Sequence, residues 1–332
     1  MNLGQAVPKN SNEYQWVRSV IQSVEKLSGR PTRWNGELNE ETEANVLGSA
    51  LDDGGMTVSR AAVLQPVAEA YTAGRPLSTT ELIDARDAVL TVVHESKHLL
   101  NTLGDEAAPG AIPVYSADAV AVEEGLTETW AHRHVNAVIR DIGMDRVQPD
   151  LLTVASPDSY PAYTAATDEL VRGTAEITGL PQDQVRSQLD QSDRTQRLAT
   201  AADLVIDERL ADVLPPEDRE AVRTQLIQTM RPHLADVETT QQSNQLTDVA
   251  KTIGGHQAAG RAITALSTTT ADLEDQYRDA ASTKSPQSAE VDHLRKFLGN
   301  ATPQTGTYRA TDGAKPDNVR HLPQRGQGQS RE

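Results

Sequence analysis

Two histidines separated by three residues are the part of this sequence best suited to chemistry. The segment His94-Glu95-Ser96-Lys97-His98 has the pattern H-E-x-x-H. In an α-helix, residues four apart lie one turn, roughly 6 Å, along the same face, so both imidazoles can reach one metal ion. Glu95 would then lie beside the open coordination position, where a carboxylate can accept a proton from bound water. The segment indicates a catalytic metal site.

A catalytic zinc site needs a third protein ligand, and carboxylates occur at a suitable place further along the chain. Glu124 lies 26 residues past His98, next to Glu123 and before Gly125. Glu128 follows Glu124 by four positions, so the two share one helix face. The sequence has no cysteine, which restricts the ligands of any metal site to histidines and carboxylates. Two histidines and one of these glutamates would complete the site.

These residues resemble the gluzincin-type zinc metallopeptidases. In that group a helix roughly 20 or more residues later supplies a glutamate ligand, often in an Asn/Asp/Glu-Glu-Gly context or in a Glu-x-x-x-Asp pattern. Glu123-Glu124-Gly125 looks like the first form, and Glu124 with Glu128 looks like the second with Glu in place of Asp. The resemblance implies that His94, His98 and Glu124 bind Zn²⁺ and that Glu95 is the general base. It also implies that Glu128 orients a ligand histidine. Glu123 and Glu128 are fallback ligands.

The resemblance covers only residues 79–142, and it departs from the usual pattern at Lys97. The stricter form of the motif has an uncharged residue at this position. A function of a different class therefore stays open. In that alternative, the chain is a non-catalytic helical scaffold or interaction protein, and its H-E-x-x-H is accidental or inactive.

The expected activity is hydrolysis of peptide bonds in a peptide or protein substrate, through a zinc-bound water that Glu95 activates. The tetrahedral oxyanion of such a reaction needs a hydrogen-bond donor. We expect His132 or Tyr115 in this role, and His132 lies one helical turn after Glu128. The other candidates are His134, Tyr160 and Tyr163.

Both halves of the candidate site fall on helices with clear sequence signals. Ser78 and Glu81 form a capping box for a helix over residues 79–103, and Gly104 is its stop signal. The apolar residues of this helix occupy most of its circumference, which predicts that the helix is mostly buried. The next helix begins near Ser116 or Asp118 and runs to about Ile142. Packing of these two helices must position the histidines against the glutamates.

The rest of the sequence also has a mainly helical period. We expect further helices at residues 13–27, 61–73, 162–177, 182–213, 218–237, 243–253, 261–280 and 289–298, with a short strand at residues 56–59. The predicted fold is mainly α: a multi-helix zincin-like metallopeptidase core with at most a small β-sheet, and a C-terminal helical region. We expect a disordered N-terminus (1–10), a catalytic metallopeptidase-like domain (11–150), a helical second lobe or module (151–299) and a disordered tail (300–332).

Composition excludes several classes of protein. Without cysteine the chain cannot be a disulfide scaffold or use a thiol nucleophile. A net charge of −17 argues against nucleic acid as a partner. The most apolar stretch, residues 88–93, is far shorter than the ~20 residues of a membrane span. No secretory signal is visible, so we expect a cytoplasmic protein, with non-classical export as the alternative. The substrate, endo- or exopeptidase action and oligomeric state are left open.

Overall fold

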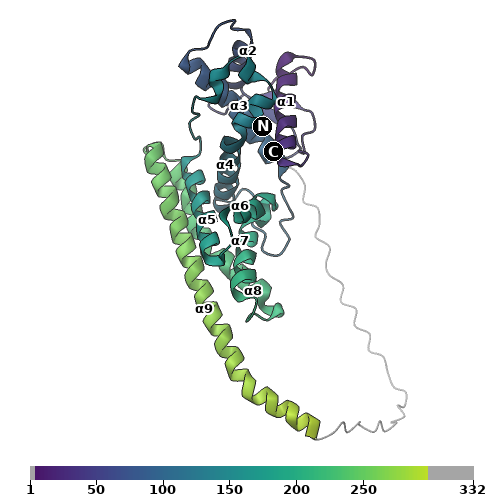
Figure 1. The fold of residues 1–332 in the computed structure, drawn as a ribbon, viewed down its shortest axis with the longest axis vertical. Coiled ribbons are helices and arrows are strands. Elements are labelled where there is room, and N and C mark those ends of the chain that lie inside the picture. The colour runs from purple at the N-terminus through teal and green to yellow at the C-terminus, as the bar shows by residue number, and fades with distance from the viewer. Residues whose placement is uncertain (1–3, 298–332) are drawn as a thin grey trace, which may run out of the picture. The chain divides into compact units, whose positions relative to one another are not determined.

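Helices make up most of the structure, a computed structural model that describes residues 4–297 and their side chains up to residue 282 (Figure 1). The helices are α1 (Asn12–Ser28), α2 (Gln65–Thr72), α3 (Thr79–Leu100), α4 (Ala117–Asp141), α5 (Pro161–Thr178), α6 (Gln182–Gln191), α7 (Arg197–Val205), α8 (Arg219–Gln241) and α9 (Asp248–Phe297). Among the described residues, no helix has the length and apolarity that a membrane crossing requires. The predicted mainly α fold with a small sheet is confirmed.

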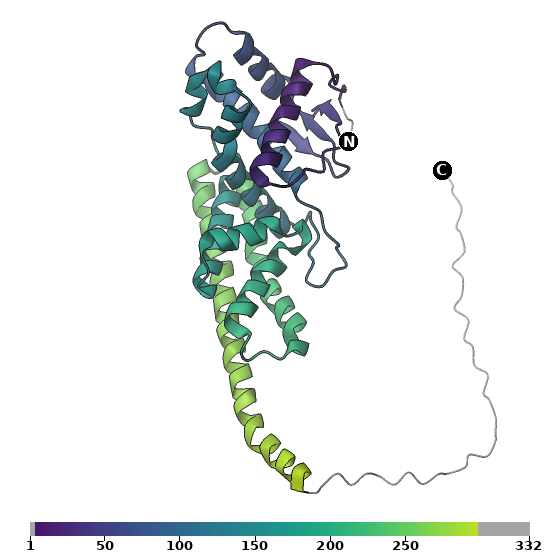
Figure 2. The ribbon, with the colours of Figure 1, turned by 45° about the vertical axis from the view of Figure 1, so that its right-hand side comes forward.

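The small sheet has three strands, which lie beside α1 (Figure 2). They are β1 (Leu38–Glu40), β2 (Gly48–Ala50) and β3 (Met56–Val58). Central β3 pairs in parallel with β1 and antiparallel with β2, so β2 is an edge strand. The predicted strand at residues 56–59 is β3, whereas β1 and β2 were not predicted. Gly48 of β2 packs closely on Thr91 and Glu95 of α3, and the sheet thereby covers the helix that carries the two histidines.

The N-terminal residues differ from the expectation of a disordered segment. Ala6 forms a β-bridge with Asn39, and the backbone N–H of Val7 donates to the carbonyl of Leu38. Val7 is also buried, and burial of this side chain together with the backbone hydrogen bonds explains the order. The expected disordered tail, residues 300–332, lies outside the described residues.

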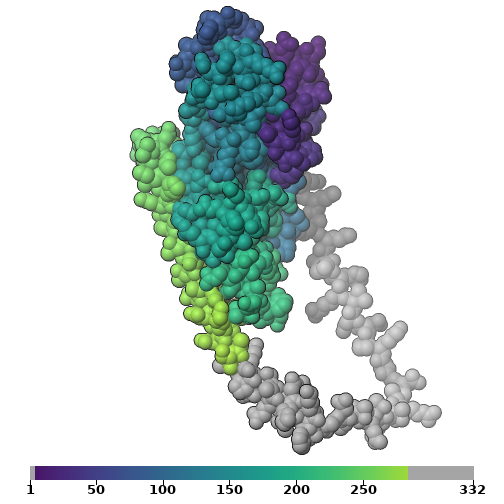
Figure 3. All heavy atoms as spheres, viewed as in Figure 1, coloured from purple at the N-terminus to yellow at the C-terminus, as the bar shows by residue number. Residues whose placement is uncertain are grey.

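Residues up to Ser282 pack as one unit, and a second unit begins at Thr283. Two hydrophobic cores stabilise the described part of the first unit. One core joins α1, α2, α3 and the sheet, and the other joins α5 to α8 with the first half of α9. On the molecular surface, the purple residues of α1 lie apart from the green residues of α8 (Figure 3). Helix α4 contributes to both cores. Its residues up to Leu126 pack in the second core, and those from Ala131 onward pack in the first. The glutamates of α4 lie near the point where this helix passes from one core to the other. The predicted boundary at residue 150 stays a prediction.

Several predicted helix boundaries are wrong. The helix expected over residues 182–213 is broken after α6, because Arg194 and Thr195 donate backbone hydrogen bonds to Thr102 and Leu103. This pairing also ends α3 at Leu100, three residues earlier than expected. In the segment expected over residues 61–73, a π-helical turn at Arg60–Leu64 precedes α2.

The three helices expected over residues 243–298 are instead the single helix α9. Gly254 and Gly255 do not break it. A Cβ at Gly255 would collide with the carbonyl of Ala162 in α5, so this glycine allows two helices to approach closely. The last residue of the expected segment, Leu298, lies outside the described residues.

Gly125 allows a second close approach, between α4 and α5. A Cβ at this position would collide with the hydroxyl of Thr167 and the carbonyl of Tyr163. The glycine that follows Glu123-Glu124 therefore has a packing role, because it brings the start of α5 against the part of α4 that carries the glutamates.

We expect Gly125→Ala to lower the free energy of unfolding by about 1–3 kcal/mol, because the new methyl group overpacks this contact. Urea denaturation measures the change. Gly260→Ala in α9 is the matched control, since its Cβ would meet only Glu169 Oε1 at 3.7 Å. That substitution is expected to be neutral or to stabilise by up to about 1 kcal/mol through helix propensity. Equal effects of the two substitutions would contradict the packing role of Gly125.

Candidate metal centre

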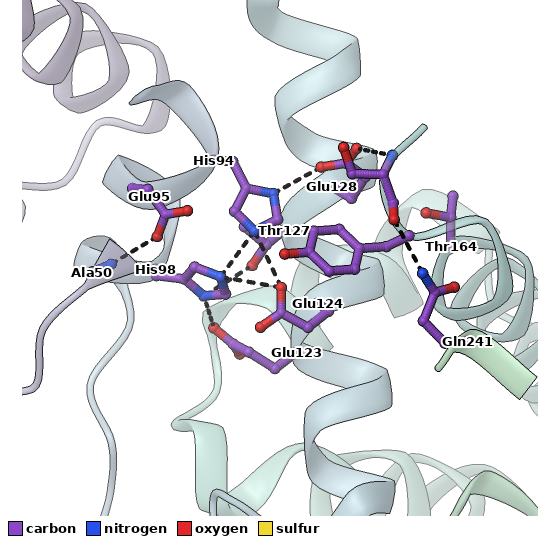
Figure 4. A network of polar contacts seen from close by, with 12 residues as sticks. Ala50, His94, Glu95, His98, Glu123, Glu124, Thr127, Glu128, Thr164 and Gln241 are labelled. Atoms are coloured by element: carbon purple, nitrogen blue, oxygen red, sulfur yellow. Dashed lines mark hydrogen bonds and ion pairs between the residues drawn. The ribbon is translucent and has the colours of Figure 1, made fainter. Parts of the chain in front are cut away.

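The side chains of His94, His98 and Glu124 converge on one point between α3 and α4 (Figure 4). Nε2 of His94 lies 3.0 Å from Nε2 of His98 and 3.1 Å from Oε2 of Glu124. The same carboxylate oxygen lies 3.4 Å from Nε2 of His98. Both histidines are buried, and the Glu124 side chain retains 19% exposure. These three residues can hold a metal ion.

Each imidazole is held at Nδ1 by a separate carboxylate of α4. Nδ1 of His94 donates to Oε2 of Glu128 at 2.8 Å, and Nδ1 of His98 donates to Oε1 of Glu123 at 2.6 Å. Because ionised carboxylates only accept hydrogen bonds, both Nδ1 atoms carry a hydrogen. In a neutral imidazole, Nε2 is then left with a lone pair, and both Nε2 atoms face the same point. This is the carboxylate–imidazole arrangement found around metal ions in proteins.

The spacing of the three inward-facing atoms fits a small cation. With bonds of about 2.0–2.1 Å, two ligands of a tetrahedral zinc ion lie about 3.3 Å apart. The three distances here run from 3.0 to 3.4 Å. Two lone pairs at 3.0 Å repel each other unless a proton or a metal ion lies between them. The donor set and its geometry therefore both fit a metal ion with an open side.

The carboxylates strongly favour positive charge at this point. Burial lowers the pKa of His98, but Glu124 and Glu123 outweigh it and raise that pKa to about 9. Burial likewise opposes protonation of His94, yet Glu124 and Glu128 hold its pKa well above the usual value. In Glu124, burial raises the pKa, but the two imidazoles hold it well below its ordinary range. A divalent metal ion would replace the protons that these groups otherwise share.

Glu95 lies on the same helix, directed toward the edge strand of the sheet. Its Oε2 accepts a hydrogen bond of 2.7 Å from the backbone N–H of Ala50 in β2 (Figure 4). Glu95 lines both of the cavities that flank the centre. Burial raises the pKa of this carboxyl, although His94 and His98 oppose the shift. A carboxylate of raised pKa beside a metal is suited to accept a proton near neutral pH.

Lys97, the departure from the usual motif, does not face the centre. Its side chain is fully buried on another side of α3, and Nζ lies 2.7 Å from Oδ1 of Asp190 in α6. It also lies 6.0 Å from the ring centroid of Trp130. Burial lowers the pKa of this lysine, and the charge of Asp190 opposes that shift. The charge at the fourth position of the motif is therefore balanced by Asp190, which α6 places against α3.

Three of the expected oxyanion donors hydrogen-bond to side chains that are not among the three metal ligands. His132 is bound through Nε2 to Oε1 of Glu128 at 3.1 Å and lines neither flanking cavity. Tyr115 is mostly exposed, and its hydroxyl donates to Asp52 at the rim of one cavity. Tyr163 donates its hydroxyl to Glu238, away from the centre.

Tyr160 lies directly beside the centre. Its ring stacks on that of His94 with the centroids 5.3 Å apart, and it lines both flanking cavities. Burial and the nearby Glu124, Glu95 and Glu128 carboxylates raise the pKa of its phenol, so the hydroxyl remains a donor at neutral pH.

A second group of potential ligands, Glu128, His132 and Asp158, adjoins the first. The oxygens of Glu128 already accept from His94, from His132 and from the backbone N–H of Ser159. We assign no metal to this group, because Glu128 is already satisfied as the residue that orients His94.

Sequence reasoning missed two features around the centre. Glu123, treated only as a fallback ligand, orients His98 and is held by a buried ion pair with Arg197. The position of Glu123 beside Glu124 was the available signal, because neighbouring helix residues point about 100° apart and can reach different imidazoles. No local pattern connects Arg197 with Glu123, since they are distant in the sequence.

Comparison with protein-family models, with curated proteins and with solved structures finds no significant match for this chain.

We expect the wild-type chain to bind one zinc ion, and His98→Ala or Glu124→Ala to weaken the binding by about 10²-fold or more, because each removes a direct ligand. Competition with a chelator and metal analysis of the dialysed protein measure this. His134→Ala is the control, since His134 stacks on Trp130 and contacts none of the ligands. Wild-type protein without bound zinc, or unchanged affinity in Glu124→Ala, would contradict the assignment.

We expect Lys97→Met to lower the free energy of unfolding by about 3 kcal/mol, because it leaves the carboxylate of Asp190 without its buried partner. A second substitution, Asp190→Leu, should recover most of the loss. Lys26→Met is the control, because the Lys26 side chain is 69% exposed where it pairs with Asp141 and such a pair contributes about 0–1 kcal/mol. If Lys97→Met were as stable as the wild type, this account of the buried charge would fail.

Proposed function

We propose that this protein is a zinc-dependent peptidase of the gluzincin type, with a zincin-like arrangement of α3 and α4. One observation carries the proposal. Two buried imidazoles on adjacent turns and a carboxylate from a second helix converge within 3.4 Å of one another, and each imidazole is oriented from behind by its own carboxylate. Such a preorganised set is costly to bury unless it holds a cation.

Zinc is the metal that this donor set favours. Two histidines and one glutamate are the ligands of a common type of catalytic zinc site, which keeps its fourth position for water or substrate. When bound, zinc supplies a Lewis acid that polarises a carbonyl group and lowers the pKa of water. His94, His98 and Glu124 would hold the ion, and Glu128 and Glu123 would keep both imidazoles in the correct tautomer.

Glu95 would act as the general base and then as the acid. Its side chain lines both cavities, and its Oε2 is anchored by the backbone N–H of Ala50. This anchor fixes the carboxylate while Oε1 can accept a proton from the attacking water. The same group can then deliver that proton to the leaving amine, as microscopic reversibility requires.

Tyr160 is the proposed donor to the oxyanion, in place of the expected His132 or Tyr115. Its phenol stays protonated next to Glu124 and Glu95, and it stacks on His94 beside the centre. A donor placed in advance at the position where negative charge develops stabilises the transition state more than the substrate. His132 supports Glu128 instead.

The cavities on both sides of the centre provide room for a peptide. One has a volume of about 310 Å³ and the other about 220 Å³, and His94, Glu95 and Tyr160 line both. Edge strand β2 forms a wall of each through Gly48. A chain lying across the centre would therefore extend in both directions from the bond to be cleaved, which favours cleavage within a peptide.

We expect Glu95→Gln to lower kcat for peptide hydrolysis by about 10²–10⁴-fold while zinc remains bound, because it removes the proton acceptor and keeps the ligands. Fluorogenic peptides and metal analysis of the same samples measure both properties. The substitution is nearly isosteric, and the amide oxygen can still accept from Ala50.

Tyr160→Phe should lower kcat by about 10²-fold with a small change in KM, because the hydroxyl acts in the transition state. Tyr163→Phe is its matched control, since the Tyr163 hydroxyl is bound to Glu238. Zinc-loaded wild type without hydrolysis of any peptide, or full activity in Glu95→Gln, would overturn the proposed function.

A further inference from the structure

The larger of the two flanking cavities is lined by acidic side chains and by no lysine or arginine among the described residues. We name it the Asp87 cavity. Its floor is one face of α3, including Asp87, Leu90 and His94. Among the described residues that line it, none is a lysine or an arginine, and three carry a carboxylate: Asp87, Glu95 and Glu128. The smaller cavity differs, because Arg194 lines it.

Two of the three carboxylates already have partners. Glu128 accepts hydrogen bonds from His94, from His132 and from the backbone of Ser159. Glu95 accepts from Ala50 and lies beside the metal ligands. Asp87 is therefore the carboxylate that is left to meet a ligand.

Asp87 has a half-buried side chain that forms no ion pair with any residue that the structure describes. Its buried Oδ1 forms no hydrogen bond of good geometry among the described residues, although the Ser156 hydroxyl lies near the carboxylate. The neighbouring Arg86 does not supply one, because its guanidinium donates to Asn136 and to the carbonyl of Leu151. Burial raises the pKa of Asp87, and the Ser156 hydroxyl and the charge of His132 only partly oppose this. Because the side chain of Asp87 also lines the cavity, a cation bound there would balance the charge of its carboxylate.

The walls near Asp87 are apolar, with Val46, Leu47 and Leu90. Lysine and arginine side chains pack their methylene stems on such surfaces and extend a charged end to a carboxylate. The cavity has a volume of about 310 Å³, which is enough for one long side chain.

We propose that the Asp87 cavity binds a lysine or arginine side chain of the substrate peptide, so that the enzyme selects peptides with a cationic residue near the cleaved bond. This inference rests on the proposed peptidase function and adds its substrate class. From Asp87 to His94 the helix rises about 10 Å, which equals about three residues of extended peptide. The cationic residue therefore lies within about three positions of the cleaved bond.

The test uses the zinc-loaded full chain and peptides blocked by N-terminal acetylation and C-terminal amidation, so that a side chain is the only cation. The peptides differ in one residue, Lys, Leu or Glu, placed at each position within about three residues of the cleaved bond. At one position, kcat/KM should be about tenfold higher for Lys than for Leu, and lower still for Glu.

Asp87→Asn should reduce the Lys-to-Leu ratio of kcat/KM by about tenfold, and Asp87→Glu should retain most of it. Asp84→Asn is the matched control, because Asp84 is an exposed acid on the same helix that does not line the cavity. Thermal unfolding of each variant reports whether it is folded. No preference for Lys, or the same preference in Asp87→Asn, would overturn the inference and leave the peptidase proposal standing.

A binding experiment separates the two proposals. The zinc-loaded Glu95→Gln variant should bind the Lys peptide about tenfold more tightly than the Leu peptide, and adding Asp87→Asn should remove the difference. If the wild type hydrolyses no peptide, the peptidase proposal fails, and this binding difference still decides the inference. Equal binding of the two peptides would overturn it.

Discussion

The pairing of α3 with α4 depends on how the charges between them are balanced. His94 and His98 on one helix face Glu123, Glu124 and Glu128 on the other, in a region with little contact with water. An isolated buried charge is costly, and removing one partner of a buried pair destabilises a protein strongly. Here two carboxylates are used to orient the imidazoles, and the third joins them in facing a common point. The packing of α3 against α4 is therefore most stable when a cation occupies that point. This constraint connects the fold to its proposed chemistry.

The rest of the fold supports this pairing from both sides. Helix α4 passes from one hydrophobic core to the other between Leu126 and Ala131, so its central glutamates lie where the cores meet. Gly125 lets α5 approach α4, which places Tyr160 against His94. From the other side, β2 packs on α3 and anchors Glu95 through Ala50. Rigid elements thus position each group, while the junction between the cores leaves cavities on both sides of the centre.

How far the sequence predicts this arrangement depends on the range of the interactions. Helix α3 was readily predicted, because Ser78 and Glu81 do form the capping box and the histidine spacing needs only helical geometry. Helix spacing and metal chemistry pointed to His94, His98 and one of the glutamates, and the choice of Glu124 came from the resemblance to gluzincin-type metallopeptidases. Features that depend on distant contacts were missed: the orientation of His98 by Glu123 with Arg197 behind it, and the break at Arg194. Tyr160 was one of several candidate donors, and only its contact with His94 distinguishes it. The continuity of α9 was missed because a glycine pair within a sequence resembles a helix break. Gly255 instead allows close packing of α9 against Ala162.

X-ray absorption spectroscopy at the zinc edge of the metal-loaded protein tests the central claim most directly. Two histidines and one glutamate predict a four-coordinate ion with two imidazole nitrogens and two oxygens, one from Glu124 and one from water, at about 2.0–2.2 Å. The imidazole scattering should fall by half in His98→Ala. A six-coordinate spectrum without imidazole scattering, or one that is unchanged in His98→Ala, would contradict the assignment of this centre.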